Sequence, residues 1–271
     1  MIAAVAALSS SIAAAGAWVP KPGSGYSKLS YTYFEADDVF GEVEDFDEFI
    51  GQNYAYYGER GLERSNWAMF GTVLLQDLEQ TNPAGEETSS FGVGDVELGL
   101  RYQWTKDSPW VFSNAAIVKL PWFYNQDDQL PRGNGQLDWE FRALLGRSIG
   151  RLGYFGLEAG YRFRTEEPSD EIRYLVEYGF NLTPNLYFRT KLDGIESANN
   201  ADEDNSGDGG SGNATLTPEF DLAKHEITLG WNFNRRKSGN QPGVEFTYTN
   251  DAYGDNTIQG ESYQLGYTIT Y

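Results

Sequence analysis

The chain ends on QLGYTITY, residues 264–271, a stretch in which apolar and polar side chains alternate. Because successive residues of a strand point to opposite faces, Leu265, Tyr267, Ile269 and Tyr271 share one face. The other face carries only polar residues and glycine. A strand that is apolar towards lipid, polar inward and aromatic at its end is typical of bacterial outer-membrane barrels. This stretch therefore predicts an all-β transmembrane protein.

The same alternation recurs along the chain. It is clearest in Asp95–Trp104, where Val96, Leu98 and Leu100 face one way and charged residues such as Glu97 face the other. Charged groups are costly against lipid, so the charged face must line the lumen. The alternating segments predict an antiparallel up-and-down barrel of about twelve strands, an even number as bacterial barrels prefer. These segments are 25–35, 51–63, 66–79, 91–104, 109–121, 137–146, 153–164, 171–181, 185–195, 219–234, 243–250 and 257–271.

The connections between these segments differ in length. Short ones are predicted at 64–66, 105–108, 150–152, 183–185 and 234–242, and the longest at 36–50, 80–90, 122–136 and 196–218. Short turns face the periplasm in bacterial barrels, and long loops face the outside. Residues 35–48 and 196–208 are rich in Asp and Glu, so we expect acidic extracellular loops.

Composition excludes several classes of protein. The chain has 271 residues, a net charge of -20 and no cysteine. No apolar run approaches the roughly 18 residues that a spanning helix needs. The negative charge argues against nucleic acid as a partner, and the lack of cysteine excludes disulfides and thiolate metal sites.

The first residues predict export. Residues 1–17 are Ala-rich and uncharged, with small residues suited to cleavage, so we interpret them as a signal peptide. Residues 18–271 are then a single barrel domain in the bacterial outer membrane. The expected partners are outer-membrane lipid and lipopolysaccharide, and the barrel-assembly machinery, which would act through the C-terminal strand.

A set of charged residues falls on the predicted inner face. They could form a polar channel whose charges set selectivity, or a ladder of ion pairs that fills a narrow barrel. Their arginines lie on consecutive strands over 137–195, which predicts a wall with net positive charge. The lumen-lining candidates are Glu97, Arg101, Glu140, Arg142, Glu158, Arg162, Arg164, Arg173, Glu177, Arg189 and Lys191.

Other candidates for chemistry are weaker. His225 is the only histidine, and its register puts it on the outward face with Ile227. A catalytic histidine needs a base or nucleophile beside it, so we expect no enzyme activity and no cofactor. Asp202, Asp204 and Asp208 lie in an acidic Gly/Ser stretch that resembles a calcium loop, but Asn213 replaces its final glutamate. We interpret that stretch as an acidic loop, with weak calcium binding as the alternative.

Three stretches resemble a family of outer-membrane barrels, the transporters of the MetA pathway of phenol degradation and the XagA-like proteins. They are WVPKPGSGYSKLSYTYF at 18–34, GVGDVELGL at 92–100 and EAGYRFRTEEPSDEIRY at 158–174, the last being the most specific. The resemblance implies a barrel that transports hydrophobic compounds, and it supplies no catalytic residue. We therefore expect a pore or transporter for passive passage of a small solute, hydrophobic or aromatic. The alternative is a surface or scaffold barrel whose acidic loops bind a partner, a polysaccharide or divalent cations.

Overall fold

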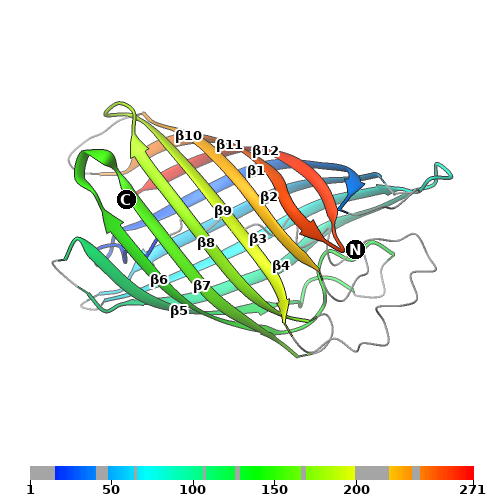
Figure 1. Cartoon of the computed structure of the whole chain (residues 1–271), viewed down its shortest axis with the longest axis horizontal. Coiled ribbons are helices and arrows are strands. Elements are labelled where there is room, and N and C mark those ends of the chain that lie inside the picture. Colours follow the sequence, from blue (N-terminus) through cyan, green and yellow to red (C-terminus); the bar gives the residue numbers. More distant parts are fainter. Residues whose placement is uncertain are drawn as a thin grey trace.

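The chain forms a closed barrel of antiparallel strands (Figure 1). The computed structural model describes residues 16–40, 48–63, 66–105, 108–125, 129–165, 169–198, 220–233 and 239–271. Within these residues there are twelve strands, as the sequence predicts. They are β1 (Gly25–Val39), β2 (Glu48–Gly61), β3 (Trp67–Thr81), β4 (Glu87–Gln103), β5 (Trp110–Leu120), β6 (Asp138–Ser148), β7 (Tyr154–Arg164), β8 (Asp170–Asn181), β9 (Leu186–Ala198), β10 (Asp221–Asn232), β11 (Gln241–Asp255) and β12 (Ile258–Thr270).

Each strand pairs with its neighbours in sequence, and β1 closes the ring by pairing with β12. At this seam Tyr26 lies opposite Thr270, and Gly25 and Tyr271 exchange backbone hydrogen bonds of 2.8 and 3.0 Å. The up-and-down topology is thus confirmed. A short 3₁₀ turn at Gly150–Leu152 joins β6 to β7. Among the described residues, no helix is long and apolar enough to cross a membrane.

Burial in this barrel is the reverse of burial in a soluble protein. Apolar side chains such as Leu98 and Leu229 are exposed on the outer face, and Leu265 is 61% exposed. Polar neighbours such as Thr228 and Thr247 are buried on the inner face, where their hydroxyls lie 2.8 Å apart. The predicted alternation therefore holds, and it gives the barrel an outer surface suited to lipid.

Aromatic side chains gather at the end of the barrel where the chain terminates. Trp67, Trp104, Trp110 and Trp231 are exposed there beside the turns. Tyr102 links two of them, with ring centroids 4.8 Å from both Trp67 and Trp104. Rings with one apolar and one wet side favour a membrane interface. We call this end, with the C-terminus, the inner mouth, and the opposite end the outer mouth.

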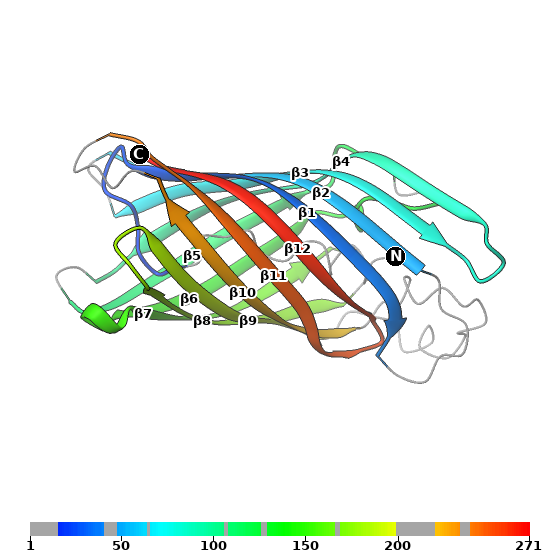
Figure 2. The same cartoon turned by 90° about the horizontal axis from the view of Figure 1, so that it is seen from above.

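The connections follow the predicted pattern at the inner mouth, but at the outer mouth several strands are longer than predicted. β1 and β2 extend into the predicted loop at 36–50, β11 continues to Asp255, and the largest difference is at 80–90. There the strands continue, and β3 and β4 meet at a tight turn, so that their hairpin projects from the outer mouth (Figure 2). The Asn82 side chain forms this turn by accepting hydrogen bonds from the backbone N–H groups of Ala84 and Glu86. Gly85 has a φ of 81°, which suits glycine. The predicted long loop at 80–90 was therefore wrong, because a side chain closes the turn locally.

Several predictions concern residues outside the described part of the chain. They are the signal peptide up to residue 15, residues 41–47 of the acidic stretch 35–48, and the calcium candidates Asp202, Asp204 and Asp208.

Candidate functional site

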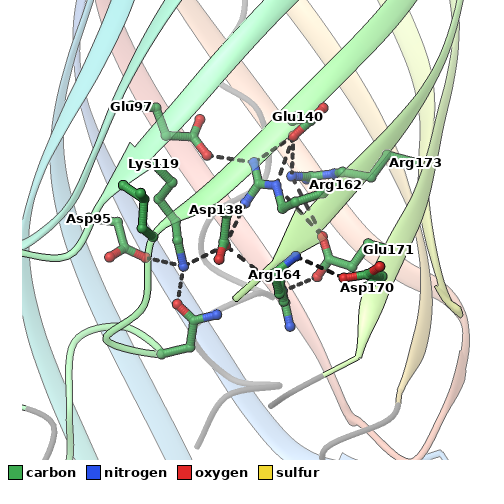
Figure 3. Close-up of polar contacts among 12 residues, drawn as sticks. Asp95, Glu97, Lys119, Asp138, Glu140, Arg162, Arg164, Asp170, Glu171 and Arg173 are labelled. Atoms are coloured by element: carbon green, nitrogen blue, oxygen red, sulfur yellow. Dashed lines mark hydrogen bonds and ion pairs between the residues drawn. The ribbon is translucent and has the colours of Figure 1, made fainter. Parts of the chain in front are cut away.

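Inward-facing charges on β4 to β8 form a connected network towards the outer half of the lumen (Figure 3). They alternate along each strand with apolar residues of the outer face, which is why they meet inside. We call this network the β4–β8 cluster. Its members are Asp95, Glu97, Lys119, Asp138, Glu140, Arg142, Glu158, Arg162, Arg164, Glu171 and Arg173.

Arg162 is the hub of the β4–β8 cluster. Its guanidinium lies 2.7 Å from Glu97 of β4 and 2.7 Å from Glu140 of β6. Glu140 is buried and also contacts Arg142 and Arg173. At the edge of the cluster, Lys119 lies 2.7 Å from Asp138. Glu97 is the most open member, with a side chain that is 33% exposed, so it faces the water of the lumen.

A second network lies towards the inner mouth, and we call it the β9–β1 cluster. Its members are Lys28, Arg189, Lys191, Glu226 and Glu245, together with Glu177 of the adjoining strand β8. Glu245 of β11 is its centre and contacts Lys28 at 2.7 Å and Arg189 at 3.6 Å. The Tyr187 hydroxyl donates a hydrogen bond to the same carboxylate. Arg189 also lies 3.9 Å from Glu177, and Lys191 pairs with Glu226 at 3.0 Å. Separately, Arg101 of β4 pairs with Glu59 of β2 at 3.0 Å.

The charges in these networks nearly cancel. In the described part of the chain, the β4–β8 cluster holds five cations and six carboxylates, and the β9–β1 cluster holds three of each. The predicted net positive wall was therefore wrong. Asp138 and Glu171 at the strand ends, together with Glu97 of β4, which lies outside the predicted wall, supply carboxylates that balance the arginines.

The ion pairs run along the wall of the barrel. Among the described residues, none of them joins strands more than three places apart in the ring, and the longest link is Glu97 of β4 to Arg162 of β7. Strands that face each other across this ring are six places apart. The pairs thus run along the wall and do not join opposite strands, and most of their side chains are buried.

The structure places all eleven predicted lumen candidates on the inner face, each in an ion pair. Ten of them belong to the two clusters, and Arg101 stands apart with Glu59. The candidates did not include several partners that complete the networks. These are Lys28, Glu59, Asp95, Lys119, Asp138, Glu171, Glu226 and Glu245. The alternation already assigns Asp95, Asp138, Glu226 and Glu245 to the inner face, although they were not among the candidates. Lys28, Lys119 and Glu171 each adjoin an outward apolar residue and follow the same rule, whereas Glu59 lies between Gly58 and Arg60 and lacks that signal.

The inner mouth contains residues 16–19, which precede β1. The Arg101 guanidinium donates hydrogen bonds to the carbonyls of Gly16 and Trp18, at 2.7 and 3.1 Å. Ser113 donates to the carbonyl of Ala17, and the Val19 N–H donates to Gln103 at 2.8 Å. These partners are inward-facing residues of β4 and β5. The segment therefore lies inside the barrel and narrows this mouth.

The outer mouth is lined by apolar side chains, which we call the outer apolar cluster. Most of its buried members lie on β1, β2, β3, β9, β10 and β12, and Phe220 directly precedes β10. Leu130 of the β5–β6 connection packs among them. They are Phe34, Ala36, Val39, Phe49, Leu78, Leu130, Ile195, Phe220, Leu222 and Ile258. The β5–β6 connection thus turns into the mouth.

Polar contacts hold that connection in place. Tyr124 donates a hydrogen bond of 2.6 Å to Asp95 of β4 and accepts one from the Gly135 N–H. Burial and the neighbouring Asp95 carboxylate raise the pKa of Tyr124, so its phenol stays protonated and keeps donating. The Arg132 side chain donates to Ser90 and to the carbonyl of Val93.

His225 faces outward, as its register predicts, but it has a partner. Its Nε2 lies 2.9 Å from the Thr190 hydroxyl on β9. Both residues lie in paired strands, where the backbone N–H groups bond to the neighbouring strand. These groups are therefore not available to form the oxyanion hole that a hydrolase would need beside His225. The sequence has one Gly-x-Ser-x-Gly match at 146–150, but its Ser148 ends β6, which is not a neighbour of β10. In the described ranges, no group of three or more His, Asp or Glu side chains could hold a metal ion.

The fold has close counterparts among solved structures. An outer-membrane channel of the COG4313 group from Pseudomonas putida F1 matches with a TM-score of 0.76 and 11% identity, covering 96% of this chain and 100% of that one. The NanC porin matches with a TM-score of 0.55 and 10% identity over 89% of this chain and 98% of that one. The translocator domain of the autotransporter NalP from Neisseria meningitidis gives 0.52 and 9% over 93% of this chain and 90% of that one.

These likenesses confirm, at the level of the fold, the resemblance to outer-membrane barrels stated above. The chain has the fold of bacterial outer-membrane channels and porins, and these counterparts are not enzymes. NalP shows that barrels of similar shape serve different purposes. The sequence matches no protein-family model and no curated protein.

Proposed function

We propose that this protein is an outer-membrane channel for passive passage of a small solute, and that the two charge clusters are the polar wall of its path. The observation that carries the proposal is the direction of the ion pairs. They link strands at most three places apart in the described barrel, so they coat the wall and do not tie opposite walls together.

The path combines apolar mouths with a charged middle. The outer apolar cluster lines one mouth, and a smaller group of apolar side chains lines the other. Between them the charges nearly cancel, so an ion finds only weak selectivity from the wall. A small solute with both an apolar or aromatic part and a polar edge fits this arrangement. Its apolar part can contact the apolar side chains at each mouth, and its polar edge can contact the paired charges between them.

The proposal includes how the protein reaches the membrane. Residues 1–17 would direct export and be removed, and the barrel-assembly machinery would act on β12. The barrel would then sit among lipid and lipopolysaccharide. The acidic stretch with Asp202, Asp204 and Asp208 would form an extracellular loop, and titration of the folded protein with calcium tests whether it binds that ion.

Conductance in a planar bilayer tests the channel. The most informative variant is Glu97→Gln, because this side chain is the most open carboxylate of the β4–β8 cluster. Its matched control is Glu261→Gln, which removes the same charge from the outer face, where Glu261 contacts Tyr248 and Tyr263. We expect the reversal potential in a salt gradient to shift towards anions for Glu97→Gln and to stay unchanged for Glu261→Gln.

The outcomes separate the two functions that the sequence left open. If the wild type conducts but both variants share its reversal potential, the β4–β8 cluster does not line the path. If neither the wild type nor a variant with a widened outer mouth, Leu130→Ala, conducts or passes small solutes into vesicles, the channel is refuted. The barrel would then serve as a surface scaffold.

A further inference from the structure

The inner mouth has a patch of wall without side chains, and one aromatic ring packs against it. Gly146 of β6 and Gly156 of β7 are register partners, and both face inward. The six-membered ring of Trp18 rests on Gly146, since a Cβ built on this glycine would lie only 2.6 Å from the Trp18 Cη2 atom. Near Gly156 such a Cβ would meet only the Glu177 Cβ, at 3.9 Å. The stretch of wall without side chains therefore includes Gly156, which is itself buried.

The surroundings of this ring are those of an aromatic binding site. Tyr154 meets the indole edge to face, with centroids 5.7 Å apart and planes at 84°. Val111, Ala115 and Leu144 form a buried apolar group against which Trp18 packs. Edge-to-face contact with Tyr154 and close contact with a side-chain-free wall both favour planar aromatic groups over bulky aliphatic ones. We call the site formed by Gly146, Gly156, Tyr154, Val111 and Leu144 the glycine cradle.

The hydrogen bonds that hold residues 16–19 do not depend on the indole. Gly16 and Ala17 would leave with the signal peptide, but two hydrogen bonds stay on the remaining backbone. Arg101 donates to the Trp18 carbonyl at 3.1 Å, and the Val19 N–H donates to Gln103 at 2.8 Å. The side chain of Trp18 is thus a separate element that fills the cradle while its backbone is docked. Removing only this side chain would empty the cradle and leave the segment in place.

We infer that the glycine cradle is a binding subsite for the neutral aromatic ring of a transported solute, and that Trp18 occupies it as a built-in substitute when no solute is bound. The inference rests on the proposed function, because it places the subsite on the conducting path. It also names the solute class, a planar ring up to the size of indole. A solute enters the cradle by displacing Trp18, which otherwise keeps the apolar wall from water.

The test uses Trp18→Ala with indole as the probe. The truncation leaves a hole of the shape of the indole, so indole should bind there with a Kd on the order of 1 mM, as for so small a ligand. Binding to the folded state alone raises the thermal unfolding midpoint of the detergent-solubilised protein. Indole should therefore raise the midpoint of Trp18→Ala and lower its conductance about twofold or more, back towards that of the wild type. The wild type, with its cradle filled, should need much higher indole concentrations.

Two controls make the result specific. Trp110→Ala removes an exposed indole that packs on Phe155 at the same end of the barrel, and it should gain no response to indole. Gly146→Val in the Trp18→Ala background puts a side chain where the ring lies, and it should abolish the response. If Gly146→Val prevents folding, Gly146→Ala in the same background serves as the control instead.

The readouts distinguish this inference from the proposed function. If Trp18→Ala conducts but indole changes neither its midpoint nor its conductance, the subsite is refuted and the channel stands. If indole stabilises Trp18→Ala but no variant conducts, the cradle binds rings but does not lie on a path, and the inference fails together with the channel. If cyclohexanol acts as well as indole, the cradle does not select planar rings and the solute class is wrong.

Discussion

Placing an arginine at two adjacent positions of β12 tests which face of the barrel meets lipid. Leu265 is exposed on the outer face, with Tyr31 and Phe246 as register partners. Gln264 is half-buried on the inner face, where its amide donates to Thr32 at 2.9 Å. The two residues share one depth but face lipid and lumen respectively, so Leu265→Arg and Gln264→Arg form a matched pair.

The depth of Leu265 sets the expected magnitude. Leu265 lies six residues before Tyr271, which ends the barrel at the inner mouth. A strand tilted by about 40° advances about 2.5 Å per residue along the barrel axis, which puts Leu265 about 15 Å from that interface. This is close to the middle of an apolar belt about 25 Å tall, where an arginine costs about 2–4 kcal/mol.

Reversible unfolding in lipid vesicles measures this cost. Guanidinium titrations followed by tryptophan fluorescence should lower the free energy of unfolding of Leu265→Arg by about 2–4 kcal/mol. Gln264→Arg should lose less than about 1 kcal/mol, because its charge enters a polar lumen. Equal losses for the two variants would refute the assignment of the faces, and a larger loss for Gln264→Arg would mean that the lumen has no room at this depth.

Two further predictions follow from the networks and the mouths. Leu130→Ala should raise the single-channel conductance, because it removes the side chain with which the β5–β6 connection packs into the outer apolar cluster. The control Leu152→Ala, in an exposed turn, should leave the conductance unchanged. Equal conductances for the two variants would mean that the connection does not narrow the path. Glu140→Gln should lower the free energy of unfolding by about 3 kcal/mol, since it removes the carboxylate that Arg142, Arg162 and Arg173 share. The control Glu261→Gln should change this free energy by less than about 0.5 kcal/mol. A similar stability for both variants would show that the β4–β8 cluster is solvated by lumen water.

The sequence predicts the barrel well because a single local rule governs it. A period of two places Leu98 and Leu265 outside and Glu97 and Thr228 inside, and no distant information is needed. The same rule fails at 80–90, where strand length depends on how the Asn82 side chain closes its turn. Turn chemistry of this kind competes with polar composition, which alone suggests a loop.

The candidate site is less predictable because it depends on which strands come together. The alternation assigns Arg162 to the lumen, but its contact with Glu97 depends on the stagger of β4 against β7, three strands away. The position of Trp18 in the inner mouth has no periodic signal at all, since residues 16–19 belong to no strand. Contacts made by segments outside the strands can be predicted only once the closed barrel is known.

The pairing of β1 with β12 has a consequence for the order of folding. It joins Tyr26 to Thr270, residues at nearly opposite ends of the sequence, while each other strand pairs with its immediate successor. The eleven other seams can zip locally as the strands become available, but this one waits for the last strand and bears the entropy of closing almost the whole chain into a loop. Until then β1 and β12 both present unpaired edges, which are templates for aggregation. Closure is therefore the late and vulnerable step, and shortening β12 by a few residues should slow folding more than an equal shortening of β6 or β7.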